Sequence, residues 1–252
     1  MTSGVHPFTS DLTIDELLLL EDVGFEPVEL VLGASYFHIG YQSGGNYYQS
    51  QELVEMSQMM LFARQSAMAE IQTQAHALGA DGIVGVRLEI EREGHHAEFS
   101  VIGTAVRRRA GDGAKFRDRH GRPFTCDLGG TDFWALFRGG FRPLALVHGV
   151  CVYHVAHQTL SNWFSTASTN CEMPAFTQGM YDARELALAR VQQDAAHAGA
   201  TAGIVGVEVR EGHYGWHSHV LEFLAVGTAV SAIEDASHET HAPARVVLSA
   251  RD

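Results

Sequence analysis

An internal repeat constrains the fold of this chain more than any other feature of its sequence. Four segments of the first half return in the same order in the second half, between 116 and 124 residues later. The paired segments are PFTSDL (7–12) with PFTCDL (123–128), 24–39 with 140–155, GIVGV (82–86) with GIVGV (203–207), and 97–106 with 221–230. Self-similarity on this scale indicates a tandem duplication, with about 105 residues in each copy.

The repeat also predicts where the domains begin and end. We expect a first domain over 7–106 and a second over 123–231, followed by a loose tail over 232–252. The segment 107–122 between them holds seven of the 17 basic residues, several glycines and no apolar period. These properties are typical of an exposed, solvated linker, although a basic patch for an acidic partner is the alternative.

Composition excludes several classes of protein. The net charge of -13 repels phosphate backbones, so nucleic acid is not an expected partner. The N-terminus has neither a basic nor an apolar signal region, and no run of about 18 apolar residues occurs, so we expect a cytoplasmic protein with no membrane partner. Three cysteines without a CxxC motif do not form a disulfide framework.

Local patterns predict the same elements in each copy. In the first copy, Thr13 and Glu16 have capping-box spacing, which predicts a short helix ending near Val23. An alternating apolar segment over 27–39 follows as a strand, and a period of three to four residues over 51–78 predicts a long helix capped by Gly79. Two further strands form a hairpin, with the faces Val84, Val86, Leu88, Ile90 and Phe99, Val101, Gly103, Ala105. The fold class is therefore α+β, with one long helix covering one face of an antiparallel sheet in each copy.

GADGIVGV (79–86) and GTAV (103–106), together with their second-half counterparts, carry a resemblance to a known family. The run from the long helix to the end of each copy resembles the YbjQ-like family, also called heavy-metal-binding domains. The resemblance implies a dodecin-like β-α-β-β subunit that assembles into pentameric rings. Where that family often has an Arg-Asp pair after its first strand, this chain has His38-Ile39 and His154-Val155, so no role of that pair is carried over.

Two domains per chain restrict how such a ring can close. Five chains with ten domains in two stacked rings satisfy the symmetry, and three chains in one six-domain ring are the alternative. We expect the first arrangement, in which the protein's partner is a further copy of itself.

Polar residues at even spacing form the first candidate site. His38, Gln42 and Asn46 match His154, Gln158 and Asn162 in the second copy. In an extended segment, even spacing places three side chains on one face, where they could line a polar pocket or contribute imidazoles to a metal. The structural alternative is that each histidine bonds nearby backbone and keeps a sheet edge or subunit contact in register.

Histidines near the second hairpin form the second candidate site. His217 and His219 are two apart, His213 lies close by, and His95 stands at the corresponding place of the first copy. This spacing suits zinc, nickel or copper, so a divalent metal is the one cofactor we consider. Exposed turns also collect histidines without any chemical role.

Other matched residues favour packing over chemistry. Arg64 and Arg184 occupy equivalent helix positions near Glu52 and Glu172, with which we expect solvated or interfacial ion pairs. The matched aromatic residues of the loops are expected to pack against the domain or a partner, with a ligand lid as the alternative; they are Tyr47, Tyr48, Trp163 and Phe164.

No GxSxG, Walker loop, GxGxxG, HExxH or CxxC motif occurs. The sequence therefore predicts a non-enzymatic, ring-forming binding or scaffold protein. The alternative is a metal-dependent enzyme that uses His154 or the cluster from His213 to His219.

Overall fold

The structure of the protein is a computed structural model that describes residues 8–38, 49–93, 95–111, 113–156, 173–213 and 219–233. The elements of the first copy are α1 (Ile14–Asp22), β1 (Phe25–His38), β2 (Gln51–Glu52), α2 (Val54–Ala77), β3 (Gly82–Glu93) and β4 (His96–Arg108). A 3-10 turn, η1 (Gly113–Phe116), lies in the connecting segment. The second copy contains β5 (Phe124–Thr125), α3 (Gly130–Arg138), β6 (Phe141–His154), α5 (Pro174–Ala198), β7 (Gly203–His213) and β8 (Val220–Ala232).

The long strands of each copy form one antiparallel sheet, and a short strand of the other copy pairs at one edge of that sheet. The first sheet has the order β1-β4-β3-β5, and the second has the order β2-β6-β8-β7. β5 belongs to the second copy but pairs in parallel with β3, while β2 belongs to the first copy but pairs with β6. The predicted α+β class is confirmed, and these two short strands tie the copies to each other.

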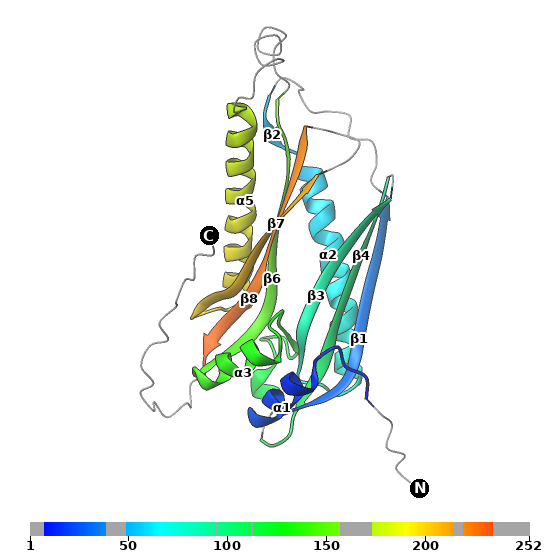
Figure 1. Cartoon of the computed structure of the whole chain (residues 1–252), viewed down its shortest axis with the longest axis vertical. Coiled ribbons are helices and arrows are strands. Elements are labelled where there is room, and N and C mark those ends of the chain that lie inside the picture. Colours follow the sequence, from blue (N-terminus) through cyan, green and yellow to red (C-terminus); the bar gives the residue numbers. More distant parts are fainter. Residues whose placement is uncertain are drawn as a thin grey trace.

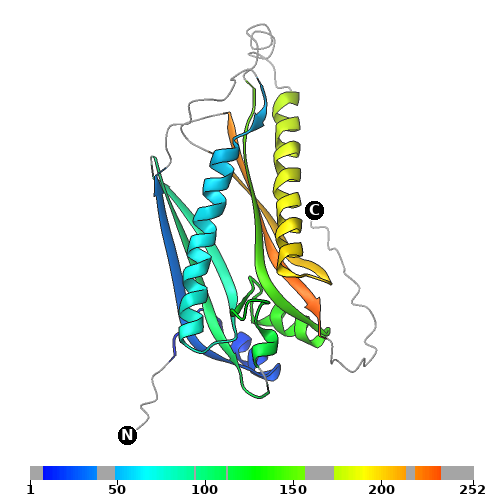
Figure 2. The ribbon, with the colours of Figure 1, turned by 180° about the vertical axis from the view of Figure 1, so that it is seen from behind.

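The sheets and long helices are stacked in alternation (Figures 1 and 2). α2 packs against β1 and β4 of its own sheet and also against β6 of the other copy. α5 packs against β6 and β8, on the opposite face of the second sheet. The second sheet is therefore covered by a helix on both faces, whereas among the described elements the first sheet has a long helix on only one.

Local sequence signals account for the ends of the first two helices. Thr13 and Glu16 form both halves of a capping box at the start of α1, as predicted. Gly79 ends α2 with a φ of 70°, a left-handed conformation that glycine adopts without a steric penalty. The predicted helix over 51–78 is too long at its start, because Gln51 and Glu52 are extended and pair with β6 of the second copy.

One predicted face of β3 is wrong at Val84. The register between β3 and β4 shifts between Val84 and Arg87, where Gly85 has a φ of 66°. A bulge of this kind inserts one residue and reverses the alternation on its far side. Val86 and Leu88 therefore face the main core, whereas Val84 faces a smaller cluster near α1.

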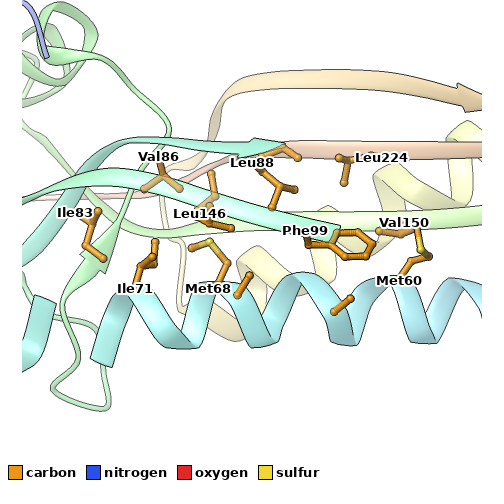
Figure 3. Packing of buried hydrophobic residues seen from close by; sticks show 14 of the residues in the cluster. Met60, Met68, Ile71, Ile83, Val86, Leu88, Phe99, Leu146, Val150 and Leu224 are labelled. Atoms are coloured by element: carbon orange, nitrogen blue, oxygen red, sulfur yellow. The ribbon is translucent and has the colours of Figure 1, made fainter. Parts of the chain in front are cut away.

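The main hydrophobic core contains residues of both copies. Met60 and Met68 of α2 and Phe99 of β4 pack in one cluster with Val150 and Leu224 of the second sheet. Figure 3 shows these side chains converging between α2 and the two sheets. A second cluster lies between α5 and the second sheet, and a third joins Phe25 and Leu20 to residues of β5 and α3.

The connecting segment is not the fully solvated linker that its composition predicts. Phe116 of η1 lies edge-on to Phe25, with ring centroids 5.6 Å apart. Arg117 donates to the Asp81 carboxylate at 3.1 Å, and the Arg108 guanidinium stacks 4.8 Å from the Phe116 ring. The charged composition of the segment suggests solvent exposure. The aliphatic stems and planar guanidinium groups of arginines can nevertheless pack on aromatic rings while their charge stays near solvent.

Gly33 and Gly149, which are equivalent in the repeat, let each long helix approach its strand closely. A Cβ added to Gly149 would overlap the carbonyl oxygen of Ala187, and one added to Gly33 would overlap that of Ala67. We expect Gly149→Ala to lower the free energy of unfolding by about 2 kcal/mol, because the helix backbone must move away. Urea denaturation measures this loss.

Gly139→Ala is the matched control, since a Cβ there approaches no atom closer than 3.3 Å. The control should stay within about 0.5 kcal/mol of the wild type. Equal urea midpoints for Gly149→Ala and Gly139→Ala would show that the close approach of α5 does not require a glycine at position 149.

Candidate functional site

The contact between the two copies is centred on a buried ion pair. The Arg64 Nη2 atom of α2 donates to the Glu222 carboxylate of β8 at 2.7 Å, and both side chains are almost completely buried. The guanidinium also lies 5.3 Å from the centroid of the Phe99 ring. A charge removed from water to this degree is stable only with a partner, so the pair specifies how the copies are placed against each other.

This arrangement corrects the predicted pairing of Arg64 with Glu52. Glu52 instead accepts two hydrogen bonds from Arg190 of α5, at 2.6 and 2.9 Å. Burial by itself would raise the pKa of Glu52, but the hydrogen bonds and charge of Arg190 lower it. Arg184, the counterpart of Arg64, is exposed and lies over the Tyr181 ring at 5.5 Å.

Backbone bonds extend the contact along the open edge of β6. The Leu53 amide donates to the Val152 carbonyl oxygen at 2.8 Å, and the Val152 amide donates to the Ser57 hydroxyl at 2.9 Å. The start of α2 is therefore attached to an edge strand of the other copy. Over Val152, Tyr153 and His154, β6 therefore no longer offers its unpaired backbone groups to other chains.

A cleft between α2 and α5 contains a buried histidine, His148. Its two adjoining parts have volumes of about 400 and 320 Å³, and both are lined by His148, Asp194, His197 and Gln65. The His148 amide donates to the Asp194 carboxylate at 3.2 Å, while its Nδ1 atom lies 3.9 Å from the same oxygen. Its Nε2 atom is buried and has no hydrogen-bond partner among the described residues.

Burial lowers the pKa of His148 to about 4, although the Asp194 charge acts in the opposite direction. The imidazole is therefore neutral near pH 7 and is a weak base compared with an ordinary histidine. A general base works best with a pKa near the operating pH, so this group suits packing better than proton transfer.

The predicted polar sites are only partly described by the structure. His38 ends β1 in an exposed position, and its ring centroid lies 5.1 Å from His96 and 6.3 Å from His95. His154 is buried at the end of β6, with Nδ1 3.3 Å from the Gln49 carbonyl oxygen. The structure thus places His38 and His95, which were predicted in different sites, next to each other.

The second histidine cluster is also only partly described. His219 accepts a bond from the Val155 amide through its carbonyl oxygen, and its ring packs on Phe176 at 5.4 Å. His213 ends β7, where only its backbone is described. The remaining predicted residues lie outside the described residues: Gln42, Asn46, Tyr47, Tyr48, Gln158, Asn162, Trp163, Phe164 and His217.

The described residues do not fit a metal centre. Among them, no group of three or more His, Cys, Asp or Glu side chains is placed to hold an ion.

Two cysteines of the described chain are equally unsuited to nucleophilic chemistry. Burial raises the pKa of Cys151 to about 12 and also raises that of Cys126, so both remain protonated thiols.

The comparisons with known proteins agree with the repeated fold. A family model described as "Putative heavy-metal-binding" (YbjQ) matches residues 48–109 and 145–233, one segment in each copy. The chain belongs to the YbjQ-like family. A Mycobacterium tuberculosis (strain ATCC 25618 / H37Rv) protein named encapsulin nanocompartment protein Rv1762c is 46% identical over 243 residues, covering 95% of this chain and 91% of that protein.

The resemblance derived from GADGIVGV and GTAV is thus confirmed. The β-α-β-β order of each copy is consistent with membership of the YbjQ-like family, whose description names no metal and no ligand residue. In the described part of the chain, no helix has the length and apolarity needed to cross a membrane.

Sequence reasoning missed Glu222 as a partner of Arg64, and it missed His148 and Asp194 altogether. A signal for two of them was present, because Glu222 and His148 each interrupt an otherwise apolar strand. A charged or polar residue inside such a strand is either paired or marks a contact. The identity of the partner could not be read, because it depends on how the copies face each other.

Proposed function

We propose that the protein is a non-enzymatic, self-assembling scaffold of the YbjQ-like family that works in the cytoplasm. Support comes from the kind of contact that joins the two copies. The first copy contributes its long helix to this contact, whereas the second contributes the far face of its sheet. Contacts between unlike surfaces can repeat from unit to unit and close into rings.

The observation that carries the proposal is that two surfaces stay uncovered within one chain, one on α5 and one on the first sheet. Among the described residues, α5 makes its main contacts with its own sheet, and the face of the first sheet away from α2 has no second long helix on it (Figures 1 and 2). Within the described residues, one face of α5 and one face of the first sheet are thus left uncovered. We infer that a further chain covers them, with five chains and ten domains as the favoured closed assembly and three chains as the alternative.

The name of the Mycobacterium tuberculosis relative supports self-assembly, since that protein is called an encapsulin nanocompartment protein. Size-exclusion chromatography with light scattering tests the proposal at micromolar concentration. We expect a mass several times the 27.5 kDa of one chain. Elution at the mass of a single chain would contradict the proposal.

Metal analysis separates this function from a metal-dependent one. We expect protein purified without a histidine tag to carry metal well below one ion per chain, because no described group fits an ion. Stoichiometric zinc, nickel or copper that is lost in His217→Ala and His219→Ala would favour the metal-dependent alternative over the scaffold.

A further inference from the structure

We propose that the contact between chains repeats the contact within the chain, with Arg184 of one chain bonding Glu98 of the next, as Arg64 bonds Glu222. This inference rests on the proposed function and names the surfaces that carry it. The occupant of both uncovered surfaces is a second copy of this chain. Three sets of equivalent residues support the assignment.

The far faces of the two sheets form the first set. On β6, Val152 is 0% exposed because α2 covers it, whereas its counterpart Tyr36 on β1 is 65% exposed. Leu32 is likewise exposed, and its counterpart His148 is buried. The first sheet thus presents to solvent the face that the second sheet buries against a helix. Large apolar side chains gathered on one face are typical of a protein contact surface.

The long helices form the second set. Met60 and Arg64 of α2 are fully buried under the second sheet, while their counterparts Met180 and Arg184 of α5 are exposed. Glu98 of β4, the counterpart of Glu222, is exposed on the far face of the first sheet. The charges on the two uncovered surfaces are therefore complementary: an arginine on the helix and a carboxylate on the sheet.

The edges of the sheets form the third set. The Cys126 amide donates to the Ile83 carbonyl oxygen at 3.0 Å, and the Val86 amide donates to the Cys126 carbonyl oxygen at 2.9 Å, which seals the β3 edge. Phe124 in this segment is 0% exposed. The equivalent Phe8 is 48% exposed, and Val207 on the β7 edge is 46% exposed where its counterpart Val86 is 3% exposed.

The N-terminal segment is already held in position for this pairing. The Asp11 carboxylate accepts a hydrogen bond from the Thr104 hydroxyl at 2.6 Å, and Asp127 bonds the equivalent Thr228 in the second copy. Each PFT-x-D-L segment is thus fastened to its own copy. The segment of the second copy, PFTCDL, also pairs with the β3 edge of the first copy. We expect Phe8 to Ser10 to join the β7 edge of the neighbouring chain in the same way.

A charge reversal tests the pair directly. Glu98→Arg and Arg184→Glu each place like charges against one another, so each should weaken association about 100-fold or more, measured by sedimentation. The double variant Glu98→Arg with Arg184→Glu restores opposite charges and should recover assembly. Both residues are exposed within the chain, so circular dichroism and urea unfolding of dilute protein should match the wild type.

Glu55→Arg is the control, because Glu55 is exposed near the start of α2 and lies on neither of the two surfaces. It should assemble as the wild type does. Assembly of either single variant at wild-type strength, or no recovery in the double variant, would overturn this assignment while leaving self-assembly intact. A wild-type chain that stays single would instead overturn the proposed function.

Discussion

Replacing Glu222 by alanine is expected to lower the free energy of unfolding by about 3–5 kcal/mol, because Arg64 is then left buried without its carboxylate. The two side chains come from different copies, so the loss falls on the packing of the copies against each other. Urea unfolding followed by fluorescence measures it.

The surface pair between Glu26 and Arg107, 2.8 Å apart and partly exposed, provides the control. Glu26→Ala should cost no more than about 1 kcal/mol, because water screens and replaces such a pair. The double replacement Arg64→Met with Glu222→Leu should regain most of the stability, since it removes both buried charges together. A loss in Glu222→Ala no larger than in Glu26→Ala would show that the pair does not order the contact.

Acid is expected to destabilise the protein through His148. The pKa of this histidine falls from its ordinary 6.5 to about 4 on folding, so the unfolded chain binds the proton more readily between these values. The stabilisation that comes from keeping His148 neutral is therefore fully present above about pH 6.5, and it is lost as the pH falls toward 4. At about 1.4 kcal/mol for each pH unit, the loss is about 3 kcal/mol.

His148→Leu removes this titration and introduces the residue that its counterpart Leu32 already provides in the first copy. We expect the urea midpoint of the variant to fall less between pH 6.5 and 4 than that of the wild type. His76→Leu, an exposed histidine near the end of α2, is the control and should keep the wild-type slope. Parallel pH profiles for the wild type and His148→Leu would contradict a buried neutral imidazole.

Local elements could be predicted from the sequence because short-range chemistry determines them. The capping box of Thr13 and Glu16, the left-handed Gly79 and the alternation in β4 all depend on neighbours within a few residues. The prediction failed at Val84, because alternation alone does not show a bulge, although Gly85 in the strand was the available signal. It also failed at Phe116, which packs in a segment whose composition suggests solvent.

The contact between the copies could not be predicted, because it depends on how two complete folds face each other. Arg64 and Arg184 occupy equivalent positions in similar sequence, yet one is buried and the other is exposed. The same holds for Glu222 and Glu98. Differences of this kind between equivalent residues are visible only once one copy covers the other, and they are what points to an interface between chains.

In our proposal one kind of contact is used twice, first within the chain and then between chains. Native mass spectrometry of the wild-type protein tests it most directly, because it counts chains without assuming a shape. We expect a discrete closed assembly of several 27.5 kDa chains, in which both copies of every chain lie in the same ring. A spectrum containing only the single chain at micromolar concentration would contradict it.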